Sequence, residues 1–192
     1  MRIESTGFSE EDLEAFLQES VAFERTRAKD DLMLADRLEA ASARLTKLVG
    51  EMPPGEAGAE SGDEWTSKDV LIHIGILSGL YGWITEEIAT QAQAKIDLMS
   101  FFSLRDVAGA QRLELPVAEL LTIAQAELGQ AAGFLRSTSP SALQRRAKVG
   151  PFDLSAEEVA RLGLCAHVES HLQQFEIAAS RASRTSEPPA LP

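Results

Sequence analysis

Cysteine and positive charge are scarce in this sequence, and each shortage excludes a class of protein. Cys165 is the only cysteine among 192 residues, so no disulfide can form within the chain. Eighteen Lys and Arg residues stand against 30 Asp and Glu residues, which gives a formal net charge of −12. Because phosphate binding relies on clustered Lys and Arg, neither nucleic acid nor an anionic membrane surface is expected as a partner.

Long apolar segments and several well-known catalytic motifs are also missing. The longest uncharged run, which contains residues 70–84, is shorter than the roughly 20 apolar residues that span a bilayer, and it is expected to form a buried helix. Acids occupy the first residues, MRIESTGFSEEDLEAF, where a secretory signal has an apolar core, so we expect a cytoplasmic protein. No G-x-S-x-G, phosphate-loop or His-Glu-x-x-His pattern occurs, and hydrolases of those kinds have no support.

Helical periodicity dominates what the sequence does contain. Apolar residues recur at helical spacing in four long stretches, at residues 30–48, 66–93, 116–137 and 155–183. Capping-box pairs mark the start of the second and fourth stretches, Thr66 with Asp69 and Ser155 with Glu158. No convincing strand pattern separates the stretches, and residues 97–115 are expected to form a long, partly helical connection. We therefore predict an all-α fold, a four-helix bundle with a long crossover connection.

A further helical segment precedes the predicted bundle. Ser9 and Asp12 are spaced as a capping box for a helix that continues to about residue 27. The final segment, SRTSEPPALP, is expected to fray. The predicted organisation is an N-terminal helical extension at residues 1–29, the bundle at 30–183 and a disordered tail at 184–192.

The second predicted helix has two unusual properties. Gly75, Gly79 and Gly82 lie along one stripe of it, although a glycine within a helix costs roughly 0.5–1 kcal/mol relative to alanine. The stripe predicts that another backbone approaches closely on that side. Apolar residues surround the rest of the helix, which places it centrally and leaves more apolar surface than one bundle core is expected to cover. This surplus favours a homodimer.

The three histidines form the sharpest functional pattern in the sequence. His167 and His171 are four residues apart, so both imidazoles project from one face of the last helix, one turn apart. His73 lies in the second helix. Neutral histidine is a common metal ligand near pH 7. A third imidazole from a facing helix would complete a three-ligand site for a divalent cation, with one coordination position open.

A less specific interpretation exists for each histidine. His73 sits on an apolar stripe, where a single histidine is more often a hydrogen-bonded core residue. Histidines at this pair's spacing also occur by accident on solvated faces. However, the neighbours on the same face of the last helix are small or polar, namely Ala160, Gly163, Ser170 and Gln174. This composition leaves room for an ion, a water and a ligand, and it shifts the balance towards metal binding by His73, His167 and His171.

Residues beside the histidines are assigned simpler roles. Asp69, one turn before His73, could orient its imidazole, but we favour a helix cap with Thr66. Trp65 is expected to anchor packing at the helix start. The only tyrosine, Tyr81, is expected to pack in the core rather than to transfer protons.

Two further neighbours of His167 are displaced from the metal face. Cys165 and Glu169 each lie about 200° around the helix from it. We expect Cys165 to be a small buried residue and Glu169 to be solvated. Ser170 and Gln174 could contact a bound ligand, and no residue is assigned as a catalyst.

The order of these motifs resembles a known family. Trp65-x-x-x-Asp69-x-x-x-His73, followed by His167-x-x-x-His171, is similar to the pattern of the DinB/YfiT-like superfamily, and residues 106–121 resemble that family's approach to its third helix. The resemblance spans residues 30–180. These proteins are four-helix bundles that include thiol-dependent S-transferases and mycothiol-dependent maleylpyruvate isomerases. The 29 residues before the bundle depart from the family pattern, and they could cover a pocket or a dimer face.

The resemblance implies a function as well as a fold. It implies that His73, His167 and His171 bind a divalent metal, usually zinc or nickel, and that the protein is a homodimer. The leading hypothesis is a metal-dependent thiol S-transferase, in which a low-molecular-weight thiol co-substrate attacks an electrophilic small molecule. The same site could activate water for hydrolysis. The alternative is a non-catalytic, stress-related binding protein with a structural or vestigial metal site.

Overall fold

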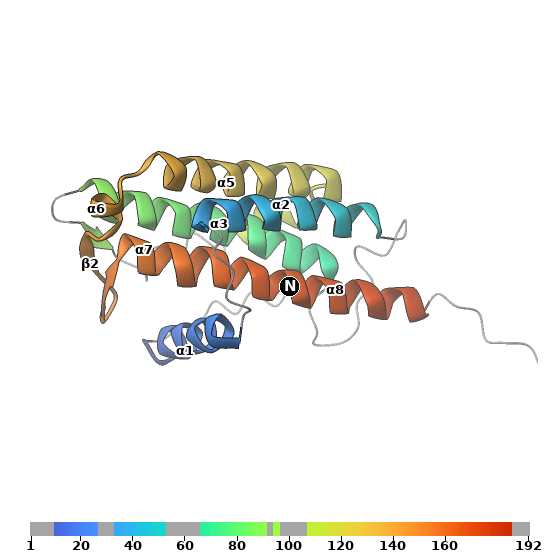
Figure 1. The fold of residues 1–192 in the computed structure, drawn as a ribbon. Helices are drawn as coiled ribbons and strands as arrows, with labels where there is room; N and C mark the ends of the chain where they lie inside the picture. Colours follow the sequence, from blue (N-terminus) through green and yellow to red (C-terminus); the bar gives the residue numbers. More distant parts are fainter. Residues whose placement is uncertain (1–9, 27–32, 53–65, 92–93, 97–106, 186–192) are drawn as a thin grey trace, which may run out of the picture.

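Four long helical rods lie side by side in the computed structural model, which describes residues 10–26, 33–52, 66–91, 94–96 and 107–185 (Figure 1). The first three rods are single helices: α2 (Leu34–Gly50), α3 (Ser67–Thr90) and α5 (Val117–Ser137). The fourth is continuous and has three parts: α7 (Ala156–Val159), the π-helical segment η2 (Ala160–Ala166) and α8 (His167–Thr185). Each rod contacts two others, in the cyclic order α2, α5, α3, α8.

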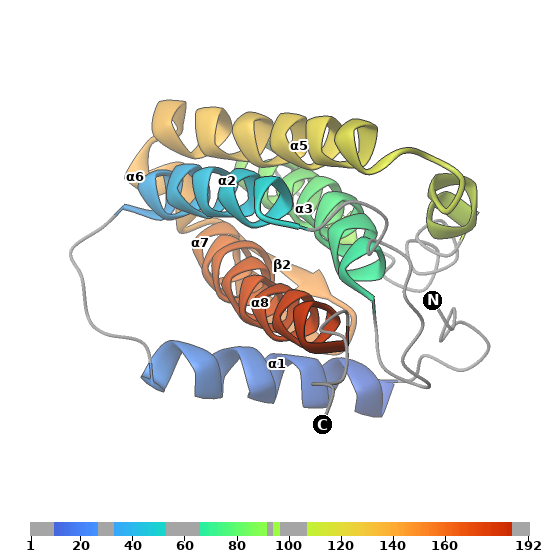
Figure 2. The same cartoon turned by 90° about the vertical axis from the view of Figure 1, so that its right-hand side faces the viewer.

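The N-terminal segment adds one helix outside this bundle. Helix α1 (Glu10–Thr26) contacts η2, and it lies on the opposite side of the α7–α8 rod from α5 (Figures 1 and 2). Ser9 of the predicted capping box lies outside the described residues, as does most of the predicted tail. Among the described residues, no helix is both long and apolar enough to cross a membrane.

Three short strands and one short helix were not predicted. The strands β1 (Lys95–Ile96), β2 (Arg146–Val149) and β3 (Phe152–Ser155) form a sheet in which β1 runs parallel and β3 antiparallel to β2. Gly150, with a φ of 59°, turns the chain between β2 and β3. The sequence shows no convincing pattern for these strands, because strands of two to four residues are too short to show clear alternation. The short helix is α6 (Pro140–Leu143).

The predicted caps position the two rods that carry the histidines. The Thr66 side chain accepts from the Asp69 backbone N–H, and the Asp69 carboxylate accepts from the Thr66 backbone N–H, which is a complete capping box. The same arrangement joins Ser155 and Glu158 at the start of α7. Both capping predictions are confirmed.

The glycine stripe of α3 faces α5, and the predicted close approach of another backbone is found at one of its three glycines. An ideal Cβ on Gly75 would lie 3.5 Å from the backbone Cα of Ala124, and one on Gly82 would lie 3.4 Å from the Cβ of Ala131. The backbone approach is thus real at Gly75. At Gly79 the neighbour is instead the carboxylate of Glu127, whose Oε2 would be 2.7 Å from an added Cβ.

Candidate metal centre

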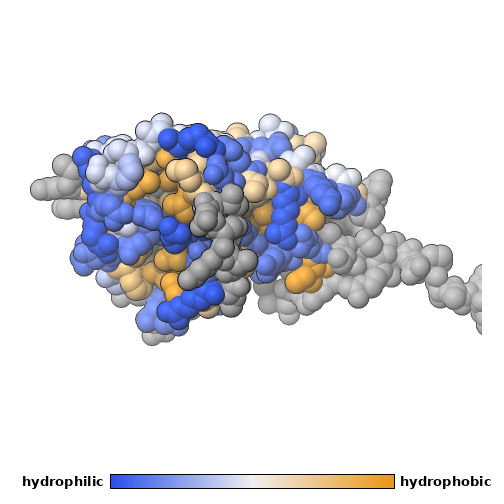
Figure 3. All heavy atoms as spheres, in the orientation of Figure 1, coloured by the Kyte–Doolittle hydropathy of each residue, from blue (hydrophilic) through white to orange (hydrophobic). Residues whose placement is uncertain are grey.

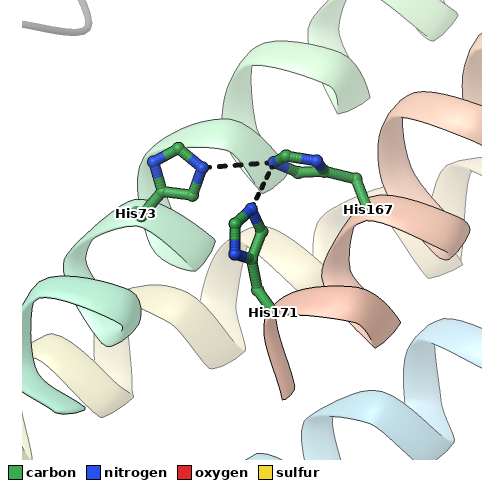
Figure 4. A group of neighbouring side chains, drawn as sticks. All are labelled: His73, His167 and His171. Carbon is green, nitrogen blue, oxygen red and sulfur yellow. Dashed lines mark hydrogen bonds between the residues drawn. The ribbon is translucent and has the colours of Figure 1, made fainter. Parts of the chain in front are cut away.

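The three predicted ligands come together between α3 and α8 (Figure 4). The Nε2 atom of His167 lies 3.2 Å from Nε2 of His73 and 3.0 Å from Nε2 of His171. One ring nitrogen from each residue falls within 4.8 Å of the other two, an arrangement that could hold a metal ion. The structure therefore brings together all three residues that the sequence singled out, across a separation of 94 residues between His73 and His167.

The spacing of the nitrogens fits a shared cation. Nitrogens at the usual Zn–N distance of about 2.0–2.1 Å lie about 3.3–3.4 Å apart in a tetrahedron and about 2.8–3.0 Å apart on one face of an octahedron. The observed 3.0 and 3.2 Å fall between these two geometries. The donor set is therefore compatible with a divalent metal ion.

Burial differs among the three rings. His167 and His171 are 9% and 8% exposed, whereas His73 is only partly buried. His73 is therefore the member of the group that is most accessible to solvent. A closed structural site has all its ligands from the protein, whereas three protein ligands with an accessible side leave a coordination position for a small molecule.

A hydrogen bond fixes the tautomer of His171. Its Nδ1 lies 2.5 Å from Oε1 of Gln174, one turn further along α8. An amide oxygen can only accept, so Nδ1 carries the proton and the lone pair of Nε2 faces the other two rings. The sequence suggested only that Gln174 could contact a bound ligand; the structure shows that it orients a candidate ligand residue, a role that its i,i+3 spacing from His171 could have indicated.

Electrostatics keep the buried imidazoles neutral. Burial, and then the proximity of His171 and His73, hold the pKa of His167 well below its usual 6.5. Burial lowers the pKa of His171 to about 4, although the hydrogen bond with Gln174 opposes this shift. Because only the neutral imidazole has a free lone pair, both residues are ready to bind a cation at neutral pH.

Glu169 does not have the role that we predicted. Its side chain is only 16% exposed, and it accepts two hydrogen bonds of 2.9 Å from Nε and Nη2 of Arg37 on α2. Arg37 is itself 2% exposed and also pairs with Glu24 of α1. The solvated position is wrong because helix α2 packs on this side of α8 and presents a cation there. Sequence reasoning missed Arg37, because no local pattern links it to Glu169, 132 residues away.

The remaining predicted neighbours divide into confirmed and untested. Asp69 caps α3 as predicted; burial opposes its ionisation, but hydrogen bonds from Thr66 lower the pKa of the carboxyl below its usual value. Cys165 is 1% exposed, and burial raises the pKa of its thiol to about 12, so it is an inert core residue. Tyr81 is buried, and its ring meets that of His167 edge-on. Trp65 lies outside the described residues.

One solved structure has the same fold. It is the structure of YfiT from Bacillus subtilis, which is described as a probable metal-dependent hydrolase with an unusual four-helix bundle topology. The alignment covers 82% of this chain and 93% of that one, with a TM-score of 0.59 and 16% sequence identity. No family model matches the sequence, and no curated protein does. The chain thus has the four-helix-bundle fold of YfiT, and the predicted all-α class and the resemblance are confirmed at the level of the fold.

Proposed function

We propose that this chain, with the bundle fold of YfiT, is a divalent-metal-dependent enzyme that activates a small nucleophile for attack on an electrophilic small molecule. His73, His167 and His171 would hold the cation, either zinc or nickel. The observation that carries this proposal is the convergence of three imidazoles in one group that is partly open to solvent. The low pKa of the two buried rings supports it, since neutral nitrogens at pH 7 are what a cation requires.

The charge of the group favours chemistry over simple storage of a metal. The cluster consists of histidines alone, and Arg37 binds the carboxylate of Glu169, the acid between the two histidines of α8. Neutral ligands leave the full charge of a divalent cation uncompensated. Such a cation would lower the pKa of a water or thiol bound to it and so supply a nucleophile at neutral pH.

Two nucleophiles fit this scheme. The motif resemblance supports a low-molecular-weight thiol, and thus a thiol S-transferase. The description of YfiT as a probable metal-dependent hydrolase supports water. In both cases the contribution of this chain is the same: it presents three neutral nitrogens, orients His171 through Gln174, and leaves the His73 side accessible.

Metal analysis tests the binding step directly. The purified protein is expected to bind about one zinc or nickel ion per chain by elemental analysis, and His73→Ala is expected to lose at least about 90% of it. Glu86→Ala is the matched control, because Glu86 is exposed on the same helix. Equal metal contents in the two variants would rule out His73 as a ligand.

Turnover assays separate the two nucleophiles. The metal-loaded protein is offered a set of bacterial thiols with electrophilic acceptors, and in parallel a set of activated esters and amides without thiol. Thiol consumption that disappears with His73→Ala supports the transferase, and thiol-independent cleavage supports the hydrolase. No turnover in either assay would favour the non-catalytic alternative. Unfolding of the bundle when a chelator removes the metal would then indicate a structural site.

A further inference from the structure

The ring of Tyr81 forms one wall of the His167 environment. Tyr81 lies on α3, roughly two turns beyond His73, and it is 7% exposed. Its ring centroid is 6.0 Å from that of His167, with an angle of 70° between the two planes. The other rings that meet His167 belong to the candidate ligands His73 and His171. Tyr81 is therefore an aromatic neighbour of His167 from outside the ligand set.

The Tyr81 ring lies so close to Gly163 on the facing rod that no residue with a Cβ fits there without a shift. An ideal Cβ on Gly163 would lie 2.7 Å from Cδ1, 2.9 Å from Cγ and 3.1 Å from Cε1 of Tyr81. Contacts this short are not tolerated between carbon atoms. Cγ is the root of the aromatic side chain, so the ring cannot avoid a new methyl group by moving its far end. Either the ring would turn to another rotamer or the two rods would separate.

Gly163 lies in an unusual part of the backbone. It is four residues before His167, within the π-helical segment η2 that ends at Ala166. A π-helical turn is wider than an α-helical one, and such segments are frequent at functional sites. The side chain of a helical residue leans over the turn that precedes it, so the imidazole of His167 leans towards the turn that contains Gly163. The Tyr81 ring thus lies against the wide turn at Gly163, on the N-terminal side of the His167 imidazole.

From this geometry we propose that Tyr81 and Gly163 act together as positioning residues, which hold the imidazole of His167 in the orientation required at the metal centre. The ring of Tyr81 packs against Gly163, where no Cβ is present, and it limits the rotation of the His167 imidazole by edge-on contact. Gln174 performs the corresponding task for His171 by a hydrogen bond. This inference rests on the proposed function insofar as it concerns a metal, but the restraint on His167 exists in the metal-free protein.

Cobalt titration of four variants tests the pair. Gly163→Ala is expected to weaken Co²⁺ affinity, measured by competition with a chelating dye, at least about tenfold and to alter the visible Co²⁺ spectrum, as loss of a supporting contact does at metal sites. Tyr81→Phe keeps the ring and should stay within about twofold of the natural protein. Once Tyr81→Ala removes the ring, adding Gly163→Ala should cause little further loss. A purely additive loss in the double variant would overturn the pairing.

Gly133→Ala is the matched control, because no atom lies within 4 Å of a Cβ added there. It should leave both affinity and spectrum unchanged. If Gly163→Ala does not fold, as judged by circular dichroism, then Tyr81→Leu replaces it: weaker binding with an altered spectrum supports the proposal. Binding by Gly163→Ala or by Tyr81→Leu equal to that of the natural protein overturns it.

A metal-free measurement separates this inference from the proposed function. Absence of Co²⁺ binding by the natural protein would contradict the metal-dependent enzyme alone. The imidazole resonances of His167 in the apo protein then decide the inference. They should shift in Gly163→Ala and not in Gly133→Ala, and identical spectra for the two variants would refute a positioning role.

Discussion

The amide of Gln174 determines which nitrogen of His171 faces the metal centre, because its Oε1 accepts from Nδ1. Gln174→Leu removes this acceptor while leaving all three histidines in place. We expect metal affinity to fall about 10–100-fold, the usual effect of losing an outer partner of a histidine ligand. Competition titration with a chelating dye measures it, and Gln173→Leu at the neighbouring exposed position is the control. Equal affinities of the two variants would show that the hydrogen bond has no influence.

The depressed pKa of His171 predicts how stability depends on pH in the metal-free protein. The pKa falls from 6.5 to about 4 on folding, so the unfolded chain takes up a proton before the folded protein does. This residue's contribution is complete above pH 6.5 and is lost as the pH falls towards 4. It amounts to about 3 kcal/mol at pH 4 relative to pH 7.

Urea unfolding of the chelator-treated protein between pH 4 and pH 7 measures this loss of stability. The variant His171→Gln cannot bind this proton, so its free energy of unfolding should fall less steeply between pH 6.5 and pH 5. Carboxylates that titrate below this range affect both proteins alike. Parallel stability curves for the two proteins would mean that His171 is not buried in its neutral form.

At the scale of the helices, two ion pairs that share the buried Arg37 join three elements. Arg37 of α2 binds Glu169 of α8 and Glu24 of α1. Burial alone would lower the pKa of Arg37, but the hydrogen bonds that it donates to Glu169 and Glu24 raise this pKa above its usual value. These two ion pairs therefore hold α1 and α2 against the rod that carries two candidate ligands.

Breaking the ion pair between Arg37 and Glu169 is expected to lower the free energy of unfolding strongly. Arg37→Met leaves Glu169 without its buried partner, and we expect the free energy of unfolding to fall by about 3–5 kcal/mol. Arg44 and Glu176 form a comparable pair between α2 and α8, but both side chains are about 40% exposed. Arg44→Met should therefore cost at most about 1 kcal/mol. Urea denaturation measures both, and similar losses in the two variants would contradict the argument from burial.

The sequence predicted the long helices well and the connections poorly. The capping boxes at Thr66 and Ser155 fix two helix starts, because their signal is local. The π-helical turn before His167 and the pairing of β1 with β2 depend on contacts between residues far apart in the sequence, so no local pattern indicates them. The same reason explains the error at Glu169, whose partner Arg37 is 132 residues away.

For the whole molecule, the candidate site could be predicted because its residues are chemically rare. Three histidines in the chain limited the choice of ligands, and helical spacing placed two of them on one face. The supporting residues could not be chosen in this way. Glycine is common in the chain, and a single tyrosine on an apolar helix usually serves only to pack the core. The contact of Tyr81 with Gly163 requires knowledge of how α3 crosses η2.

The expected homodimer has less support from the fold than from the sequence. Helices α5 and α8, together with η2, contact α3 and cover much of the apolar surface that suggested a second copy. Trp83 on α3 is still 40% exposed, and on the face drawn in Figure 3 hydrophobic patches lie between hydrophilic residues.

Light scattering tests the dimer directly. We expect twice the chain mass of 20.8 kDa at micromolar concentration. We further expect Trp83→Glu to shift the mass towards that of one chain, because it places a charge on an exposed apolar position. A mass of one chain for the unaltered protein would remove the dimer.

The separation of 94 residues between His73 and His167 has a consequence beyond the chemistry of the site. A cation held by both would join the two ends of a span that includes β1, all of α5 and the β2–β3 hairpin. Since only the folded chain brings those ends together, ion concentration and resistance to denaturation become linked. At a free ion concentration 100 times the dissociation constant the gain is about 2.7 kcal/mol. Scarcity of the ion in the surrounding medium would then shorten the lifetime of the folded protein as well as remove its metal-dependent activity.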